Sequence, residues 1–181
     1  MYFEQPGKVN TTQTVEAAMK IARERGIRHI VVASVRGETA MLLTGFSGQV
    51  ICVTHVNGFS ENGQNEMTDA MRERIVQAGV KVLTGTHVLS GVERGMSSQF
   101  KGTYPAEIIA HSLRMMGQGT KVCVEVAVMA LDAGLIPYDE KIVAIGGTGL
   151  GVDTALIMTP AHASQIFQTR IHEVICKPSF A

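Results

Sequence analysis

A short segment that combines hydroxyl, arginine and glycine residues follows the first buried strand expected in this chain. It begins at Ser34 and runs through Arg36 and Gly37 to Thr39, directly after an apolar run. Backbone N–H groups, hydroxyls, a guanidinium and a glycine that permits close approach are the groups that bind a phosphate dianion. The segment therefore predicts a phosphate-binding loop. The alternative is that Ser34 and Thr39 only cap the following helix while Arg36 is solvated.

Two Thr-His pairs end the next two expected strands. They are Thr54 with His55, and Thr86 with His87. Because the carboxyl ends of neighbouring parallel strands meet at one edge of a sheet, we expect both histidines near the phosphate-binding loop. Histidine can hydrogen-bond a ligand or act as an acid or a base, although both pairs can also be ordinary polar strand ends. No HxxxH or HExxH spacing occurs and no cysteine is placed to assist, so no metal site is expected.

A glycine-rich segment, IGGTGLGVDT, joins two late strands. It is not the dinucleotide fingerprint, because Val152 stands where the third glycine would be required and because the segment leads into a strand instead of a helix. Repeated glycine lets backbone amides approach a ligand closely, although a simple hairpin would need glycine too. The candidate ligand-binding residues in it are Gly146, Gly147, Thr148, Gly149, Asp153 and Thr154.

Two further features have charged residues in unusual places. Residues 86–104 lack a clear period, and so long a loop in a compact domain is usually functional or mobile. Its pair Glu93 and Arg94 can belong to a lid or lie in solvent. Glu125 stands inside an apolar helix, where we expect it to be partly buried with Arg94 or a hydroxyl as its partner, catalysis being the alternative.

Helical and strand periods alternate along the chain. Helical spacing is expected over residues 10–26, 67–79, 105–117 and 121–133, with a short helix after Gly37. Short β-branched runs predict strands over residues 29–35, 49–54, 80–83, 141–145, 154–159 and 171–176. This alternation predicts an α/β fold, a three-layer α/β/α sandwich with a mostly parallel sheet. At 181 residues, the chain is expected to form a single domain over residues 1–181.

Composition restricts the class of partner. The chain has 16 Lys and Arg against 16 Asp and Glu, so its neutral charge predicts neither nucleic-acid nor membrane binding. No apolar run approaches ~20 residues and the N-terminal segment lacks the apolar core of a signal peptide. The cysteines, Cys52, Cys123 and Cys176, lie far apart in apolar surroundings, which predicts reduced core thiols and a cytoplasmic protein.

Two of these motifs together resemble the C-terminal domain of pyruvate kinase. There, a hydroxyl-glycine-hydroxyl loop holds a phosphate of the sugar bisphosphate activator, and a glycine-rich loop between strands closes over the same ligand. The resemblance places Ser34 and Thr39 at the hydroxyl positions, Gly37 at the glycine, and residues 146–151 in the closing loop. The catalytic barrel of pyruvate kinase is missing, so phosphoenolpyruvate chemistry is not implied.

Nearly the whole chain is similar to the small stand-alone pyruvate kinase α/β-domain-like proteins of archaea and bacteria, whose cellular role is not established. The motifs that carry this likeness are VVASVRGETA, THVNGF, HVLSGVER, KVCVE, GGTGLGVDT, PAH and EVICKP. Members of this group are associated with flavin mononucleotide (FMN), so the resemblance implies FMN as the cofactor here.

Two classes of function follow from these observations. The first is an FMN-binding protein, either an oxidoreductase or a flavin carrier, in which the ring chemistry belongs to the cofactor. The second is a non-catalytic sensor domain that binds a phosphorylated metabolite and changes its oligomeric state, as the pyruvate kinase domain does. In both cases a small-molecule phosphate ligand and a homo-oligomer are expected, and whether the chain is an enzyme stays open.

Overall fold

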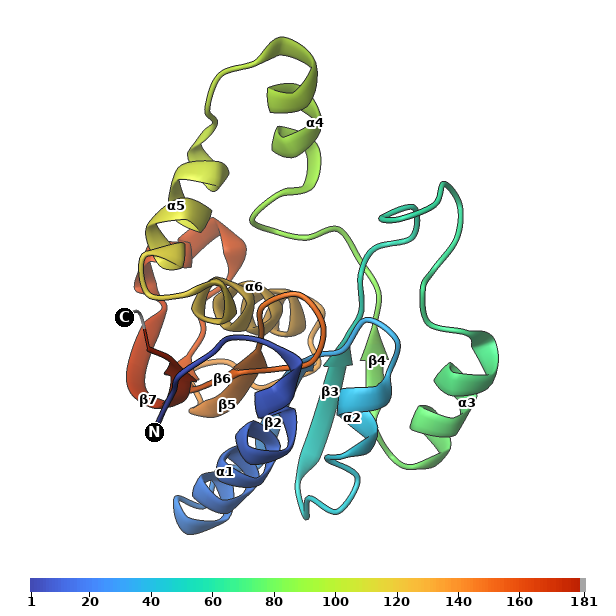
Figure 1. The fold of residues 1–181 in the computed structure, drawn as a ribbon, viewed down its shortest axis with the longest axis vertical. Coiled ribbons are helices and arrows are strands. Elements are labelled where there is room, and N and C mark those ends of the chain that lie inside the picture. Colours follow the sequence, from blue (N-terminus) through green and yellow to red (C-terminus); the bar gives the residue numbers. More distant parts are fainter. Residues whose placement is uncertain (180–181) are drawn as a thin grey trace.

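A single mixed sheet forms the centre of the molecule in the computed structural model, which describes residues 1–179 (Figure 1). In the described chain the strand order is β1-β7-β6-β5-β2-β3-β4. The strands are β1 (Tyr2–Phe3), β2 (His29–Ala33), β3 (Gln49–Val53), β4 (Lys81–Leu83), β5 (Ile142–Gly146), β6 (Thr154–Thr159) and β7 (Arg170–Pro178). Strands β5, β2, β3 and β4 run parallel to one another, and β1 is parallel to β7. Only the ladders of β6 with β5 and with β7 are antiparallel among the residues described, so the sheet is mostly parallel as expected.

Helices cover both faces of this sheet. They are α1 (Thr11–Glu24), α2 (Glu38–Met41), α3 (Asp69–Gln77), α4 (Gly91–Phe100), α5 (Pro105–Arg114) and α6 (Gln118–Asp132), with short 3₁₀ helices η1 (Lys8–Asn10) and η2 (Ala163–Gln168). Buried side chains of α1, α2 and α3 form the core on one face, and those of α6 form the core on the other. Helix α5 packs against α6. The α/β fold with helices on both faces is therefore confirmed.

The two cores follow directly from the alternation of side chains along a strand. In β2, Ile30 and Val32 point to the core that contains α1, whereas Val31 points to the core that contains α6. All three are fully buried. A strand buried on both faces has no polar position to offer, which explains its continuous apolar sequence.

Helix α6 is buried around most of its circumference. The predicted helix over residues 121–133 is confirmed, although its sequence is rich in β-branched residues that favour strands. Gly146 allows this close packing, because a Cβ there would lie 2.7 Å from the carbonyl oxygen of Gly119 in the first turn of α6. Within residues 1–179, no helix is both long enough and apolar enough to cross a membrane.

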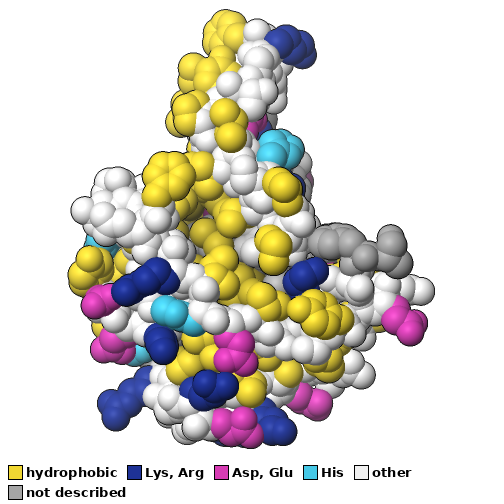
Figure 2. Space-filling model, turned by 90° about the vertical axis from the view of Figure 1, so that its left-hand side faces the viewer, with side chains coloured by type: hydrophobic (Ala, Val, Ile, Leu, Met, Phe, Trp, Pro, Cys, Tyr) yellow, Lys and Arg dark blue, Asp and Glu magenta, His cyan; other side chains and the backbone are white. Residues whose placement is uncertain are grey.

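The irregular segment expected over residues 86–104 is corrected by the structure, because it contains helix α4. The helix buries no residue, and its sequence is rich in Gly and Ser, which have low helix propensity. Its Val92, Met96 and Phe100 do recur at helical spacing. Polar contacts tie it to α5: Ser97 donates a hydrogen bond to Glu107 (2.6 Å), and Glu93 accepts one from the Ala106 N–H (2.7 Å). Helices α4 and α5 form an arm that projects from the body, with hydrophobic side chains on its surface (Figures 1 and 2).

The three cysteines are buried and unpaired, as the sequence predicts. Burial raises the pKa of the Cys52 thiol to about 12, and it also raises the pKa values of Cys123 and Cys176. All three thiols are consequently protonated at neutral pH, and the thiolate is the reactive form.

We expect the folded protein to be inert toward thiol reagents. Native protein mixed with Ellman's reagent at pH 8 should release almost no thionitrobenzoate over minutes, whereas protein unfolded in guanidinium should release three equivalents. Rapid reaction of one thiol in the native protein would contradict the burial of that cysteine.

Candidate functional site

A cavity of about 660 Å³ opens beyond the carboxyl ends of β2, β3 and β5. We call it the edge pocket. The residues predicted from the sequence that line it are Ser34, Arg36, Thr39, His55, Gly147 and Gly149. Further lining residues are Lys8, Thr11, Thr12, Ala33, Val35, Glu38, Leu42, Phe59, Gln118, Val122, Leu150 and Gly151.

The topology explains why a cavity forms at this edge. The chain adds β3 and β4 on one side of β2, and then returns to place β5 on the other side. In parallel α/β sheets, such a reversal separates the loops that follow the two neighbouring strands and leaves a crevice where ligands bind. The edge pocket lies at this reversal, between the segment after β2 and the segment after β5.

The loop after β2 has both a structural and an exposed part. Ser34 is buried, and its hydroxyl accepts a hydrogen bond from the Ala40 N–H (3.3 Å), so this residue does cap α2. Thr39 is buried in the first turn of α2 and lines the pocket. Arg36 also lines it, and its side chain is exposed, with no ion pair or hydrogen bond among the described residues. Its charge acts on the Glu66 carboxylate without forming an ion pair with it. The capping alternative thus holds for Ser34, and the exposed Arg36 is compatible with both the anion site and a solvated side chain.

Gly37 serves the fold at this point instead of facing the cavity. Its φ of +89° is in the left-handed region that side chains rarely adopt. A Cβ on Gly37 would lie 2.4 Å from Cδ1 of Ile75 and 2.8 Å from Cγ of Met71, both on α3. The glycine therefore lets α2 begin close against α3.

The glycine-rich segment is a hairpin loop between β5 and β6 that also forms one wall of the edge pocket. Gly149 has a φ of +72° and open space around it. Gly151 packs tightly, because a Cβ there would meet the hydroxyl of Thr11 at 2.3 Å. The same hydroxyl accepts a hydrogen bond from the Val152 N–H (3.1 Å). The segment is therefore a hairpin, and its backbone lines a cavity, whereas the approach of a ligand to its amides stays a prediction.

The remaining predicted residues of this segment lie outside the cavity lining. Asp153 is fully buried and accepts hydrogen bonds from the Gly7 N–H (2.8 Å) and from the hydroxyl of Thr154 (2.8 Å). Thr154 is equally buried, and Gly146 faces α6. Thr148 is half-buried and does not line the pocket either. Asp153 therefore fastens the loop to the segment before α1.

His55 is held in a fixed orientation at the pocket wall. Its Nδ1 lies 2.8 Å from Oε2 of Glu66, and Ser60 donates a hydrogen bond to the other carboxylate oxygen (2.8 Å). The Phe59 ring lies against the imidazole with 3.8 Å between centroids. Burial opposes ionisation of Glu66, but hydrogen bonds from Ser60 and His55 outweigh it and lower the pKa of this carboxyl. An ionised Glu66 favours a proton on Nδ1 of His55 and leaves Nε2 as the acceptor.

The two Thr-His pairs meet at the same edge of the sheet, as expected. The rings of His55 and His87 are 5.4 Å apart in an edge-to-face arrangement. Thr86 and His87 line an adjoining smaller hollow, whereas Thr54 is buried and bonded to the hydroxyl of Thr84 (2.7 Å). Burial lowers the pKa of His87, and the neighbouring His55 and Lys121 lower it further against the opposing Glu125 carboxylate, so His87 is neutral at pH 7.

Glu125 is buried with a partner that the sequence interpretation did not assign to it. It forms an ion pair with Lys121, one helical turn earlier, and not with Arg94. Its second oxygen accepts a hydrogen bond from the Leu89 N–H (3.0 Å). Burial lowers the pKa of Lys121, although the attraction of Glu125 opposes this. The pair therefore fixes the loop that carries His87 onto α6.

Sequence reasoning missed the contribution of two helix starts to the edge pocket. Thr11 and Thr12 come from the first turn of α1 and Lys8 from the preceding 3₁₀ helix η1, whereas Gln118 and Val122 come from the start of α6. The only signal was a run of hydroxyl residues typical of a helix start, and nothing local indicates that this helix start lies beside the loop after β2.

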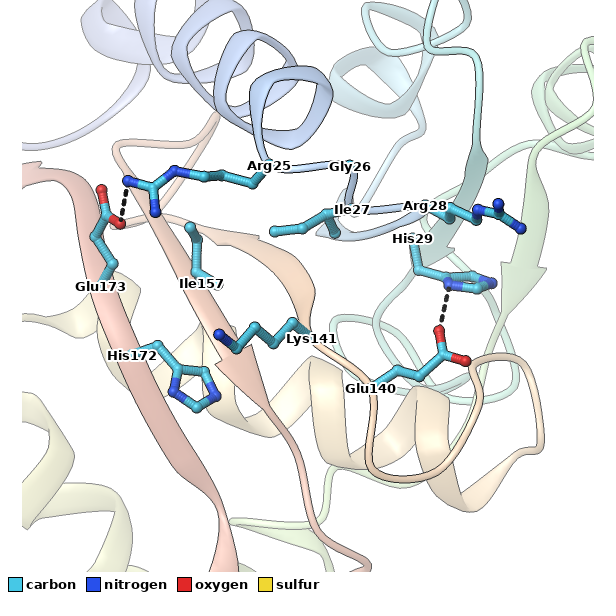
Figure 3. Close-up of a pocket in the computed structure, with 10 residues that line it drawn as sticks. All are labelled: Arg25, Gly26, Ile27, Arg28, His29, Glu140, Lys141, Ile157, His172 and Glu173. Atoms are coloured by element: carbon cyan, nitrogen blue, oxygen red, sulfur yellow. Dashed lines mark hydrogen bonds and ion pairs between the residues drawn. The ribbon is translucent and has the colours of Figure 1, made fainter.

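A second cavity, of about 650 Å³, lies at the opposite ends of the strands (Figure 3). Its charged groups are partly neutralised by each other, because Arg25 pairs with Glu173 (3.2 Å) and His29 lies 3.9 Å from Glu140. It contains none of the residues predicted from the sequence. Volume does not distinguish the two cavities, but position and chemistry favour the edge pocket as the functional site. No group of three or more metal-ligating side chains gathers anywhere in residues 1–179.

The protein is therefore an α/β protein with an open sheet and a cavity beyond the carboxyl ends of its parallel strands. The family model described as the pyruvate kinase alpha/beta domain matches residues 12–158. The chain belongs to this family. A similar solved structure is a pyruvate kinase from Cryptosporidium parvum, with 14% sequence identity and a TM-score of 0.40 over 93% of this chain. The chain spans 23% of the length of that enzyme.

Replacing Lys121 should destabilise the protein strongly. Lys121→Met would leave the Glu125 carboxylate buried without its counter-charge, so we expect a loss of about 3 to 5 kcal/mol in the free energy of unfolding. Urea unfolding followed by circular dichroism measures this. The matched control is Lys20→Met on α1, whose exposed pair with Glu24 (3.9 Å) should contribute less than about 1 kcal/mol. Equal losses in the two variants would contradict the structural role of the buried pair.

His87 should make folding sensitive to acid. Because its pKa in the folded protein lies below the unfolded value, the unfolded chain binds more protons, and stability falls as the pH drops below about 6.5. His87→Gln should reduce the stability lost between pH 7.5 and pH 5.5 in urea unfolding experiments. His111→Gln, at an exposed position on α5, serves as the control and should lose as much stability over this pH range as the unmodified protein. An unchanged loss in His87→Gln would show that the imidazole is not the group responsible.

Proposed function

We propose that this protein binds FMN in the edge pocket, with the phosphate group at the loop after β2. The observation that carries the proposal is the mixed lining of the pocket, which combines cations and hydroxyl groups with exposed apolar side chains. A ligand that has both a phosphate and a flat apolar ring system fits such a lining. The protein would act through this cofactor, either in electron transfer or as a carrier of the flavin.

The cations and hydroxyl groups that line the pocket are suited to binding a phosphate. Arg36 and Lys8 both line it, and neither side chain has an ion pair or hydrogen bond among residues 1–179. Thr39, Thr11 and Thr12 add hydroxyl groups at the starts of α2 and α1. A dianion placed here would gain charge-assisted hydrogen bonds without displacing an existing ion pair of either cation.

The apolar side chains of the lining support an aromatic ring system. Leu42, Phe59 and Leu150 line the pocket, and each is about half exposed. Exposed apolar side chains gathered round a polar cavity are typical of a binding site. The isoalloxazine ring would cover them, and the fixed imidazole of His55 would offer it a hydrogen-bonding group.

The projecting arm favours a second candidate function, a non-catalytic sensor of a phosphorylated metabolite. Val92, Met96 and Phe100 recur every four residues on α4 and are exposed, so they lie along neighbouring positions of its surface. Such a surface suits a domain that changes its oligomeric state when the phosphate site is filled. The homo-oligomer expected from the resemblance stays a prediction, and the two functions share the phosphate site.

FMN binding should depend on the hydroxyl of Thr39. One charge-assisted hydrogen bond contributes about 1.5 to 3 kcal/mol, so Thr39→Val should weaken FMN binding roughly tenfold or more. Quenching of flavin fluorescence during titration measures the affinity. The matched control is Thr44→Val, an exposed threonine whose hydroxyl bonds only to the Met41 carbonyl, and it should bind like the unmodified protein. Equal affinities for Thr39→Val and Thr44→Val would contradict the phosphate position.

The absorption spectrum of the purified protein separates the two candidate functions. Bands near those of free flavin, with FMN released on heating, support the flavin protein. A colourless protein that takes up no added FMN, but changes its sedimentation with sugar phosphates, would contradict the flavin proposal and support the sensor.

A further inference from the structure

A smaller hollow of about 300 Å³ adjoins the edge pocket. We call it the Arg94 pocket. It is lined by Val56, Gly58, Phe59, Thr86, His87, Ser90, Gly91 and Arg94. Phe59 also lines the edge pocket, so the two spaces are neighbours on one surface.

One layer of rings forms the wall between the two pockets. The Phe59 ring lies 3.8 Å from the His55 ring and 5.6 Å from the His87 ring, and the two imidazoles are 5.4 Å apart. The Glu66 carboxylate, itself held by Ser60, fixes His55 in this layer. Ligands in the two pockets would therefore lie on either side of the same aromatic cluster.

Arg94 gives the smaller pocket its charge. The guanidinium has no ion pair or hydrogen bond among the described residues, because the acid expected to pair with it, Glu125, is already bound to Lys121 and to the Leu89 N–H. Lys121 adds no net charge to this region, because Glu125 compensates it. The Glu107 carboxylate interacts electrostatically with Arg94 but forms no ion pair with it. The guanidinium therefore lines the pocket without a direct partner, together with His87 and the hydroxyl of Thr86.

We propose that the Arg94 pocket binds a small carboxylic acid beside the ligand of the edge pocket. A planar guanidinium binds a carboxylate through two parallel hydrogen bonds, which suits one arginine facing one acid group. The volume is at the lower end for ligand sites, so the acid has only a few carbon atoms. His87 and Thr86 would hydrogen-bond a hydroxyl or carbonyl group on the neighbouring carbon. The role of the acid as a co-substrate rests on the proposed function. Binding of the acid in this pocket does not depend on that function.

Titration with lactate, observed by nuclear magnetic resonance, tests the proposal. Lactate added to the protein should shift the side-chain N–H signal of Arg94 and the ring signals of His87 along one saturating curve. Arg94→Gln should weaken lactate binding at least tenfold. The control is Arg74→Gln on α3, an exposed arginine that does not line the pocket, and this variant should bind lactate with unchanged affinity. Equal affinities in Arg94→Gln and Arg74→Gln would overturn the proposal.

Two further measurements determine which class of anion binds at Arg94 and distinguish this proposal from the proposed binding of FMN. Inorganic phosphate should compete only weakly for the Arg94 signal, and phosphate that binds there more tightly than lactate would overturn the assignment to carboxylic acids. The lactate titration is run with and without FMN. Arg94-dependent lactate binding in a protein that takes up no FMN would support this site while the proposed function fails. FMN binding without any effect of lactate on Arg94 and His87 would overturn this site alone.

Discussion

The carboxylate of Glu125 is the interaction on which the arrangement of the candidate site depends. It is buried in α6, where an unpaired charge would be prohibitively costly, and the neighbouring Lys121 compensates it. Because its other oxygen accepts the Leu89 N–H, the loop after β4 is fixed against the helix. That loop carries His87, whose ring completes the aromatic wall between the two pockets. One buried ion pair thus connects the core to the surface where ligands would bind.

A second buried carboxylate has a similar role on the other side of the edge pocket. Asp153 accepts hydrogen bonds from the Gly7 N–H and from Thr154, so it joins the glycine-rich hairpin to the segment that leads into α1. The tight approach of Gly151 to Thr11 supports the same junction. Several residues that appeared suited to a cofactor from their types alone, such as Asp153 and Thr154, are instead fully buried and lie outside the pocket lining. Arg36 and Lys8 line the pocket and have no ion pair or hydrogen bond among residues 1–179.

Much of the fold could be predicted from the sequence, because the strands at the centre of the sheet are short apolar runs with clear ends. The strand over residues 154–159 has the predicted bounds, and β2 and β3 begin at the predicted residues. Helix α4 was not predicted, because its Gly and Ser residues have low helix propensity, although Val92, Met96 and Phe100 recur at helical spacing. The two-residue strand β1 is too short to have a period at all.

The candidate site could be predicted only in part. The residues that follow β2, β3 and β5 in the chain were found, because the carboxyl ends of parallel strands share an edge. The contribution of Lys8 depends on how α1 packs on the sheet, and the partner of Glu125 depends on which residues are buried together. Lys121 and Glu125 are four residues apart and could have been paired from helical spacing, whereas Arg94 is adjacent to neither in sequence.

The central claim is that the edge pocket is the place where this protein binds its ligand. A crystal structure of the protein with FMN diffused into the crystal tests it most directly. We expect electron density for the phosphate beside Arg36 and Thr39, and for the ring beside Phe59 and the glycine-rich hairpin. Density in the cavity formed by Arg25, Lys141 and His172, with the edge pocket left to solvent, would contradict it.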